Sequence, residues 1–203
     1  MGTNIFTFCS HVESETVAGR NAQEPGRANG GAGLAVGQRN KARGQHDPFH
    51  RLHTKQVRAL QSGAADAHGQ RPEHHISDGG GNPCRHCLTE VPKGAGMLVL
   101  AHRPFDGLHP CAETGPIFLC TEACARFDSD DVPAILTTSP DYLIKGYGTD
   151  DRILYGTGAV VAAGDLTRRA KELLVRPEMA YLHVRSARNN CYQCRIDRTT
   201  PRA

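Results

Sequence analysis

The fold is decided by residues 180–194, which read AYLHVRSARNNCYQC. Apolar residues at positions 180, 182 and 184 alternate with tyrosine, histidine and arginine at 181, 183 and 185. This period of two is typical of a half-buried β-strand, because successive side chains of a strand point to opposite faces. The strand leads directly into a pair of cysteines, Cys191 and Cys194, so the segment joins a core element to a candidate ligand loop.

Outward from this segment, short apolar runs bounded by Gly and Pro predict buried strands at 97–101 and 116–120. Further strands are expected at 142–147, 152–155 and 159–161, and a loop at 74–83. Apolar residues at helical spacing predict helices over 54–67, with Thr54 as its cap, and over 165–176. Strands that outnumber two or three helices indicate an α+β fold built on a mainly antiparallel sheet.

The first 48 residues of this 203-residue chain differ from the rest in composition. Gly, Ala, Arg, Gln and Asn dominate residues 20–48, which cannot bury enough apolar surface to offset the entropy of ordering. Residues 1–48 are therefore expected to be a disordered or non-native N-terminal extension. Residues 49–203 are expected to form a single compact α+β domain, which is long enough for one core.

Charge and hydropathy limit the classes of partner. A net charge of +3 disfavours nucleic-acid binding, and the first 48 residues are nearly neutral as well. Weak nucleic-acid binding through zinc and Arg-rich loops stays open as an alternative function. No apolar run approaches the ~20 residues that a membrane span requires, and residues 1–20 lack a secretory pattern. The sequence thus predicts a soluble cytoplasmic protein whose thiols are kept reduced.

Eight cysteines in 203 residues indicate metal binding or thiol chemistry. Cys84 and Cys87 form one CxxC pair, and Cys191 and Cys194 form another. Two intervening residues allow both sulfurs of a pair to turn toward one point, and two pairs complete the tetrahedral shell of a zinc ion. The sequence therefore predicts a structural zinc site with these four cysteines as ligands.

Other interpretations of the cysteines stay open. They can be reduced side chains packed in the core, or Cys84 or Cys191 can serve a thiol-dependent oxidoreductase or hydrolase. A second site made from Cys111, Cys120, Cys124 and His109 or His102 is also conceivable, but Cys120 ends an apolar run, which favours a core position. His86 lies between the first two cysteines, and an exposed position in the loop is favoured for it over a role as a metal ligand.

A polar cluster follows the strand of residues 180–185. Its members carry guanidinium or amide groups; they are Arg185, Arg188, Asn189 and Asn190. Forked guanidinium donors suit a carboxylate or phosphate, so these four residues are candidates for a small anionic ligand. The equally favoured alternative is that they anchor a turn. No nucleotide-binding, hydrolase or metalloprotease motif accompanies them, so no catalytic residue can be named.

Several motifs resemble the bacterial domain-of-unknown-function family 1203. They are NPCRHCL at 82–88, RPF at 103–105, ETGPIF at 113–118 and HVRSARNNC at 183–191. The similarity spans about residues 49–198 and leaves out the first 48. Cys111 and Cys120 differ from what the family leads us to expect at these places, which makes them less expected as ligands. The resemblance implies a small bacterial cytoplasmic protein and transfers no catalytic residues.

Overall fold

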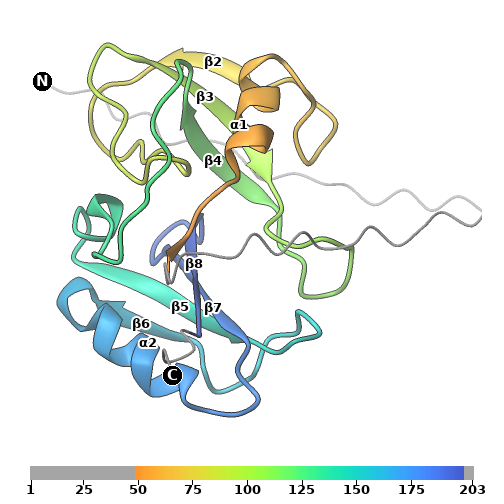
Figure 1. Cartoon of the computed structure of the whole chain (residues 1–203), viewed down its shortest axis with the longest axis vertical. Helices are drawn as coiled ribbons and strands as arrows, with labels where there is room; N and C mark the ends of the chain where they lie inside the picture. The colour runs from red at the N-terminus through yellow and green to blue at the C-terminus, as the bar shows by residue number, and fades with distance from the viewer. Residues whose placement is uncertain (1–48, 199–203) are drawn as a thin grey trace, which may run out of the picture. The chain divides into compact units, whose positions relative to one another are not determined.

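The computed structural model of the chain describes residues 49–198, which contain two antiparallel sheets and two α-helices (Figure 1). The elements in chain order are β1 (Phe49–His50), α1 (Thr54–Gln61), β2 (Glu73–Ile76), β3 (Gly96–His102), β4 (Gly115–Cys120), the 3-10 turn η1 (Ala134–Leu136), β5 (Asp141–Tyr147), β6 (Ala159–Ala162), the 3-10 turn η2 (Ala163–Asp165), α2 (Leu166–Leu174), β7 (Tyr181–Ser186) and β8 (Tyr192–Asp197). The predicted α+β class is confirmed. The prediction for residues 1–48 lies outside the described residues.

The larger sheet has five strands in the order β1-β8-β7-β5-β6, and every pairing in it is antiparallel. Helix α2 covers one face, where Leu166, Ala170 and Leu173 pack in one core with side chains of β5, β7 and β8. Leu182 and Val184 of β7 belong to this core and are fully buried. Burial of this apolar face is what holds α2 on the sheet.

The other face of β7 is also covered, which the alternating pattern did not predict. Tyr181, His183 and Arg185 are buried, whereas a half-buried strand would expose them. The ring of Phe105, from the segment between β3 and β4, lies 5.1 Å from the ring of His183. Contacts from the segment between β3 and β4 therefore bury the polar face of β7 as well.

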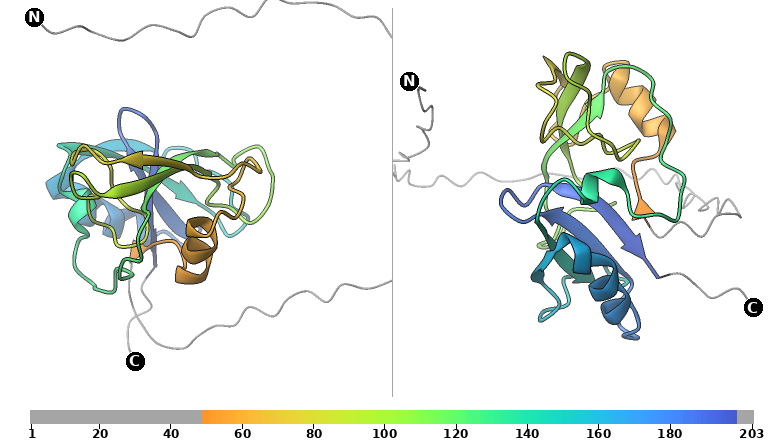
Figure 2. Two further views of the ribbon diagram at one scale, coloured as in Figure 1. Left: turned by 90° about the horizontal axis from the view of Figure 1, so that it is seen from above. Right: turned by 90° about the vertical axis from the view of Figure 1, so that its left-hand side faces the viewer.

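The smaller sheet has the order β2-β3-β4 and packs against α1. Val57 and Leu60 of the helix share a core with apolar side chains of β3 and β4. Figure 2 shows the two sheets in separate halves of the described region, with the segment between β4 and β5 running from one to the other. The two halves also meet directly, since the rings of His102 in β3 and Tyr192 in β8 lie 5.4 Å apart.

Several local predictions were wrong. Residues 73–76 form the edge strand β2, but all four side chains are exposed, so no alternation marks it in the sequence. The segment 152–155 contributes only one isolated bridge, between Ile153 and Tyr147. Helix α1 stops at Gln61 rather than continuing to 67, because Gly63 follows in the left-handed region with φ of +88°.

Within residues 49–198, no helix has both the length and the apolar character needed to cross a lipid bilayer.

Candidate metal centre and the adjoining polar sites

Four cysteine sulfurs gather at one end of the smaller sheet. Cys84, Cys87, Cys120 and Cys124 place their Sγ atoms within 4.8 Å of one another. The Sγ atoms of Cys84 and Cys124 are 4.0 Å apart, as are those of Cys87 and Cys120. Four thiolates around a zinc ion at about 2.3 Å would lie about 3.8 Å from one another. The four sulfurs therefore already stand close to the spacing of a tetrahedral metal site.

The first two cysteines of the cluster lie on a tight turn. The backbone N–H of Leu88 donates to the carbonyl of Cys84, and the N–H of Cys84 donates to the carbonyl of Thr89. Leu88 takes a left-handed conformation with φ of +53°, a position that glycine ordinarily occupies in such turns. Its side chain is fully buried in the core of the larger sheet. Packing of this side chain thus maintains a backbone conformation that is unfavourable for leucine.

The second two cysteines of the cluster are positioned by β4 and α1. Cys120 is the last residue of β4, and its backbone N–H donates to Cys84 Sγ. Two side chains of α1 hold the loop that follows: Arg58 donates to the carbonyl of Cys124, and Gln61 donates to the carbonyl of Cys120. The helix therefore fixes the backbone of both cysteines.

His86 supports this group without belonging to its four sulfurs. The side chain is fully buried, which corrects the expectation of an exposed loop histidine. Its Nδ1 lies 3.1 Å from Cys124 Sγ, and its Nε2 lies 3.0 Å from the hydroxyl of Thr54. Burial, with a contribution from Arg58, lowers the pKa of His86, so the ring is neutral. The neutral ring can donate from Nδ1 to the sulfur and accept from Thr54 at Nε2. The prediction of Thr54 as the helix cap was wrong, because α1 begins at Thr54 and its N-cap is His53.

The four thiols cannot all ionise without a counter-charge. Hydrogen bonding to Cys120 and Cys124 lowers the pKa of Cys84 to about 7, and contact with Cys120 holds the pKa of Cys87 well below its usual range. Contact with Cys124 raises the pKa of Cys120. Like charges this close oppose one another, and a bound cation removes that repulsion.

The structure keeps only half of the predicted ligand set together. Cys84 and Cys87 are joined by Cys120 and Cys124, in place of Cys191 and Cys194. Cys194 is buried in the core beneath α2, and the thiol of Cys191 lies 3.6 Å from the carbonyl of Asn189. The physical reason is strand pairing. Residue 84 forms a parallel bridge with Phe118, so the neighbour of the first pair is the end of β4.

Leu88 gives a direct test of this turn. Leu88→Ala should lower the free energy of unfolding by about 3 kcal/mol through the lost core packing. Leu88→Gly loses the same packing but removes the left-handed strain of about 1 kcal/mol. We therefore expect the glycine variant to be at least as stable as the alanine variant in urea unfolding, the reverse of the usual order. A glycine variant clearly less stable than alanine would contradict this account of the turn.

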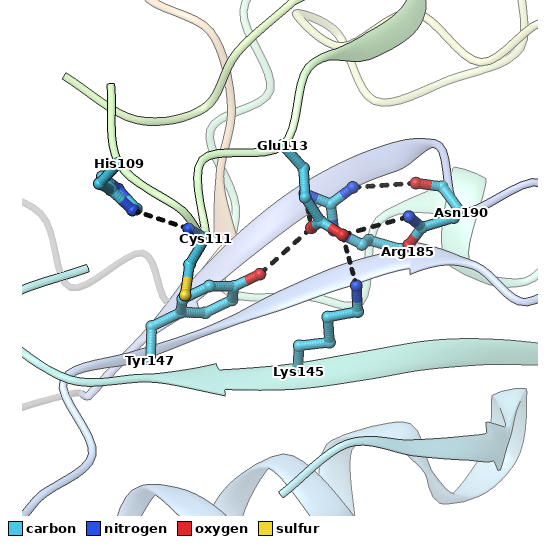
Figure 3. Close-up of polar contacts among 7 residues, drawn as sticks. All are labelled: His109, Cys111, Glu113, Lys145, Tyr147, Arg185 and Asn190. Atoms are coloured by element: carbon cyan, nitrogen blue, oxygen red, sulfur yellow. Dashed lines mark hydrogen bonds and ion pairs between the residues drawn. The ribbon is translucent and has the colours of Figure 1, made fainter. Parts of the chain in front are cut away.

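A second polar group surrounds Glu113, in the segment before β4 (Figure 3). The Glu113 carboxylate lies 2.6 Å from Lys145 Nζ of β5 and 2.9 Å from Arg185 Nη2 of β7. The amide of Asn190 donates to it at 3.3 Å, and the hydroxyl of Tyr147 donates at 3.4 Å. Burial alone would raise the pKa of Glu113, but Lys145 and Arg185 hold it below its ordinary value.

Two of the four predicted anion-binding residues are thus occupied within the protein, since Arg185 and Asn190 both bind Glu113. Arg185 also donates to the carbonyl of Asn190, which anchors the turn after β7. The other two, Arg188 and Asn189, line a cavity between the sheets. Arg188 is exposed and paired with Asp141. Arg185 thus anchors a turn, which is the alternative that the sequence left open, whereas the binding of an anion by Arg188 and Asn189 stays a prediction.

His183 is a buried histidine next to this network, and its sequence pattern indicates only that it belongs to a strand. Neither ring nitrogen of His183 has a hydrogen-bond partner among the described residues. The ring lies 4.6 Å from that of Tyr147 and 5.0 Å from that of Tyr192. Burial, reinforced by Arg185, lowers the pKa of His183 well below its usual value. It is therefore a neutral ring within an aromatic layer.

Comparison with known proteins adds the family. The model of the family described as Protein of unknown function (DUF1203) matches residues 81–198, more than half of the chain. The chain belongs to this family. The resemblance seen in the sequence motifs is confirmed, and the matched range includes all four clustered cysteines and the Glu113 network. No curated protein and no solved structure matches the chain.

Proposed function

We propose that Cys84, Cys87, Cys120 and Cys124 bind one zinc ion that stabilises the fold. The observation that carries this proposal is the mutual approach of the four sulfurs to within 4.8 Å. With four protein ligands the ion would have no open coordination position, which is the arrangement of structural rather than catalytic zinc. Tetrahedral sulfur sites also accept iron, but a redox-inert ion fits a stabilising role better.

The ion would crosslink segments that are distant in the chain. Cys84 and Cys87 precede β3, whereas Cys120 and Cys124 end β4 and begin the long connection to β5. Three of the four sulfurs have a hydrogen-bonding neighbour besides cysteine thiols: the N–H of Cys120 for Cys84, the hydroxyl of Thr89 for Cys87 and the ring of His86 for Cys124. Such donors compensate the charge that remains on metal thiolates.

We also keep a bacterial cytoplasmic location as part of this proposal. A four-thiolate site requires reduced cysteines, which a reducing compartment maintains. A thiol-dependent activity is less well supported for Cys84, because that side chain is fully buried. Cys191 is the better candidate for such an activity, since it is partly exposed and lines the cavity between the sheets.

Metal analysis of protein purified without a histidine tag tests the proposal. We expect about one equivalent of zinc per chain, and its loss in Cys87→Ser and in Cys124→Ser, because each removes one of four ligands. Cys191→Ser is the matched control and should keep the metal. Iron as the bound metal would contradict the choice of ion. Zinc lost in Cys191→Ser but kept in Cys124→Ser would contradict the ligand set and favour the pairing expected from sequence.

A further inference from the structure

A cavity with a volume of ≈ 500 Å³ lies where the two sheets meet. Its walls come from four strands, with Phe118 of β4, Tyr142 of β5, Ser186 of β7 and Gln193 of β8. It is separate from the four sulfurs, none of which lines it. A cavity of this size, with polar groups set among apolar walls, is typical of a small-molecule site.

The buried guanidinium of Arg85 is the first unusual feature of this cavity. Arg85 is 1% exposed and lines the cavity. Its Nε donates to the carbonyl of Tyr192 at 2.6 Å, and Nη1 donates to the carbonyl of Pro83. These bonds orient the side chain but supply no negative charge. Among residues 49–198 no carboxylate lies within ion-pair distance of Arg85; the charge of Glu90 acts on it only at longer range, and its guanidinium carbon lies 5.9 Å from the centroid of the Phe118 ring. A buried charge whose counter-charge lies beyond hydrogen-bond distance is costly.

Two acceptor oxygens without partners lie on the same cavity wall. Glu90 uses Oε2 to accept from the N–H of Asn82, while its Oε1 is buried and has no partner among the described residues. Gln193 is 6% exposed, and its Oε1 is likewise buried without a partner among the described residues. A buried acceptor left without a donor costs about 1–3 kcal/mol, so both oxygens favour a ligand that brings donors.

We infer that this cavity binds a small zwitterion carrying a carboxylate and an ammonium group, the chemistry of a free α-amino acid. The carboxylate would pair with Arg85, and the ammonium group would donate to Glu90 Oε1 and Gln193 Oε1. A simple anion would satisfy Arg85 but leave both acceptor oxygens unpaired. A simple cation would leave the guanidinium unpaired. A ligand that carries both charges satisfies all three groups, and its ammonium group also compensates the charge of Glu90.

The apolar part of the cavity wall indicates which side chain the ligand carries. Pro116, Phe118 and Ile135 line the cavity beside the polar groups, so an aliphatic or aromatic side chain of the ligand has a surface to cover. Arg188 and Asn189 of the β7–β8 turn lie at its exposed side. They are the two residues of the predicted anion-binding cluster that are not bound to Glu113. This cavity is independent of the proposed metal site in all but one respect: Arg85 lies in the chain between Cys84 and Cys87, which are proposed metal ligands.

Isothermal titration calorimetry with defined probes tests this inference. L-alanine and L-leucine serve as zwitterions, and acetate and ethylammonium each carry only one of the two charges. We expect the amino acids to bind at least about tenfold more tightly than either single-charge probe, since they alone meet all three groups. Failure of both amino acids to bind, or equal binding of acetate, would overturn the inference.

Glu90→Gln isolates the ammonium contact, because the amide can still accept from Asn82 but carries no charge. We expect amino-acid binding to weaken at least about tenfold in this variant, while the weak binding of acetate is unchanged. Glu172→Gln on the exposed face of α2 makes the same chemical change outside the cavity and should bind as the native protein does. Native affinity in Glu90→Gln would overturn the assignment. Zinc content, measured on every variant, separates this outcome from failure of the metal proposal.

Discussion

Removal of the zinc ion proposed for the four sulfurs is expected to lower the free energy of unfolding of the described domain by at least about 5 kcal/mol, because structural zinc contributes about 10–16 kcal/mol of apparent binding energy in small domains. The ion would connect the turn before β3 to the end of β4, and α1 packs against both strands. Without it, four thiols within 4.8 Å of one another lose the cation that compensates their charge. The smaller sheet should open first.

Hydrogen exchange in the presence and absence of a chelator measures this effect by region. Amides of β3 and β4 should lose protection when the metal is removed, whereas those of β5 and β7 in the larger sheet should lose much less. Cys120→Ser should reproduce the chelator effect, and Cys111→Ser, which changes a cysteine outside the cluster, should not. Equal protection of β3 and β4 with and without chelator would show that the fold does not depend on a metal.

Glu113→Gln is expected to lower the free energy of unfolding by about 3 kcal/mol, because two buried or half-buried cations lose their shared carboxylate. The Arg185 side chain is 4% exposed and Lys145 is 18% exposed, so both cations would lose their carboxylate partner away from bulk water. Urea unfolding at pH 7 measures the loss. Glu178→Gln, which removes a surface partner of Arg176, is the matched control and should change little.

The effect of this substitution should depend on pH in a defined direction. The pKa of Glu113 is lowered in the folded protein, so its contribution is complete above the ordinary value of 4.5 and is lost as the pH falls toward the folded value. The difference in stability between the native protein and Glu113→Gln should therefore shrink below about pH 4.5. Any metal lost from the four sulfurs at low pH would be lost from both proteins alike, so the difference reports on Glu113. A difference that is constant from pH 7 to the acid transition would contradict the ion-pair account.

Elements with a strong local pattern were predictable. The apolar runs that became β3 and β4 lie between Gly and Pro, and α2 carries one apolar face. Strand β2 was missed because an edge strand with four exposed side chains has no apolar period. The division into two sheets was missed as well. Sheet membership depends on which strands pair, and the sequence pattern of a strand does not name its partner.

The candidate site was half predictable for a similar reason. Two residues between Cys84 and Cys87 are enough to place both sulfurs on one side of a turn. The second half of the site depends on the bridge between residue 84 and Phe118, which sets Cys120 beside the turn. The alternative CxxC pair has the better spacing but lies at β8, where Cys194 points into the core of the larger sheet.

The sequence by itself determined the α+β class, the strand that became β7, the helix α2 and the approach of the Cys84 and Cys87 side chains to one another, because each depends on residues close together in the chain. Only the tertiary structure decided that Cys120 and Cys124 complete the cluster of four sulfurs, that Arg185 binds Glu113, and that the buried Arg85 lines a cavity together with Glu90. These three facts depend on segments that strand pairing and packing bring together. Local periodicity carries no information about such pairing.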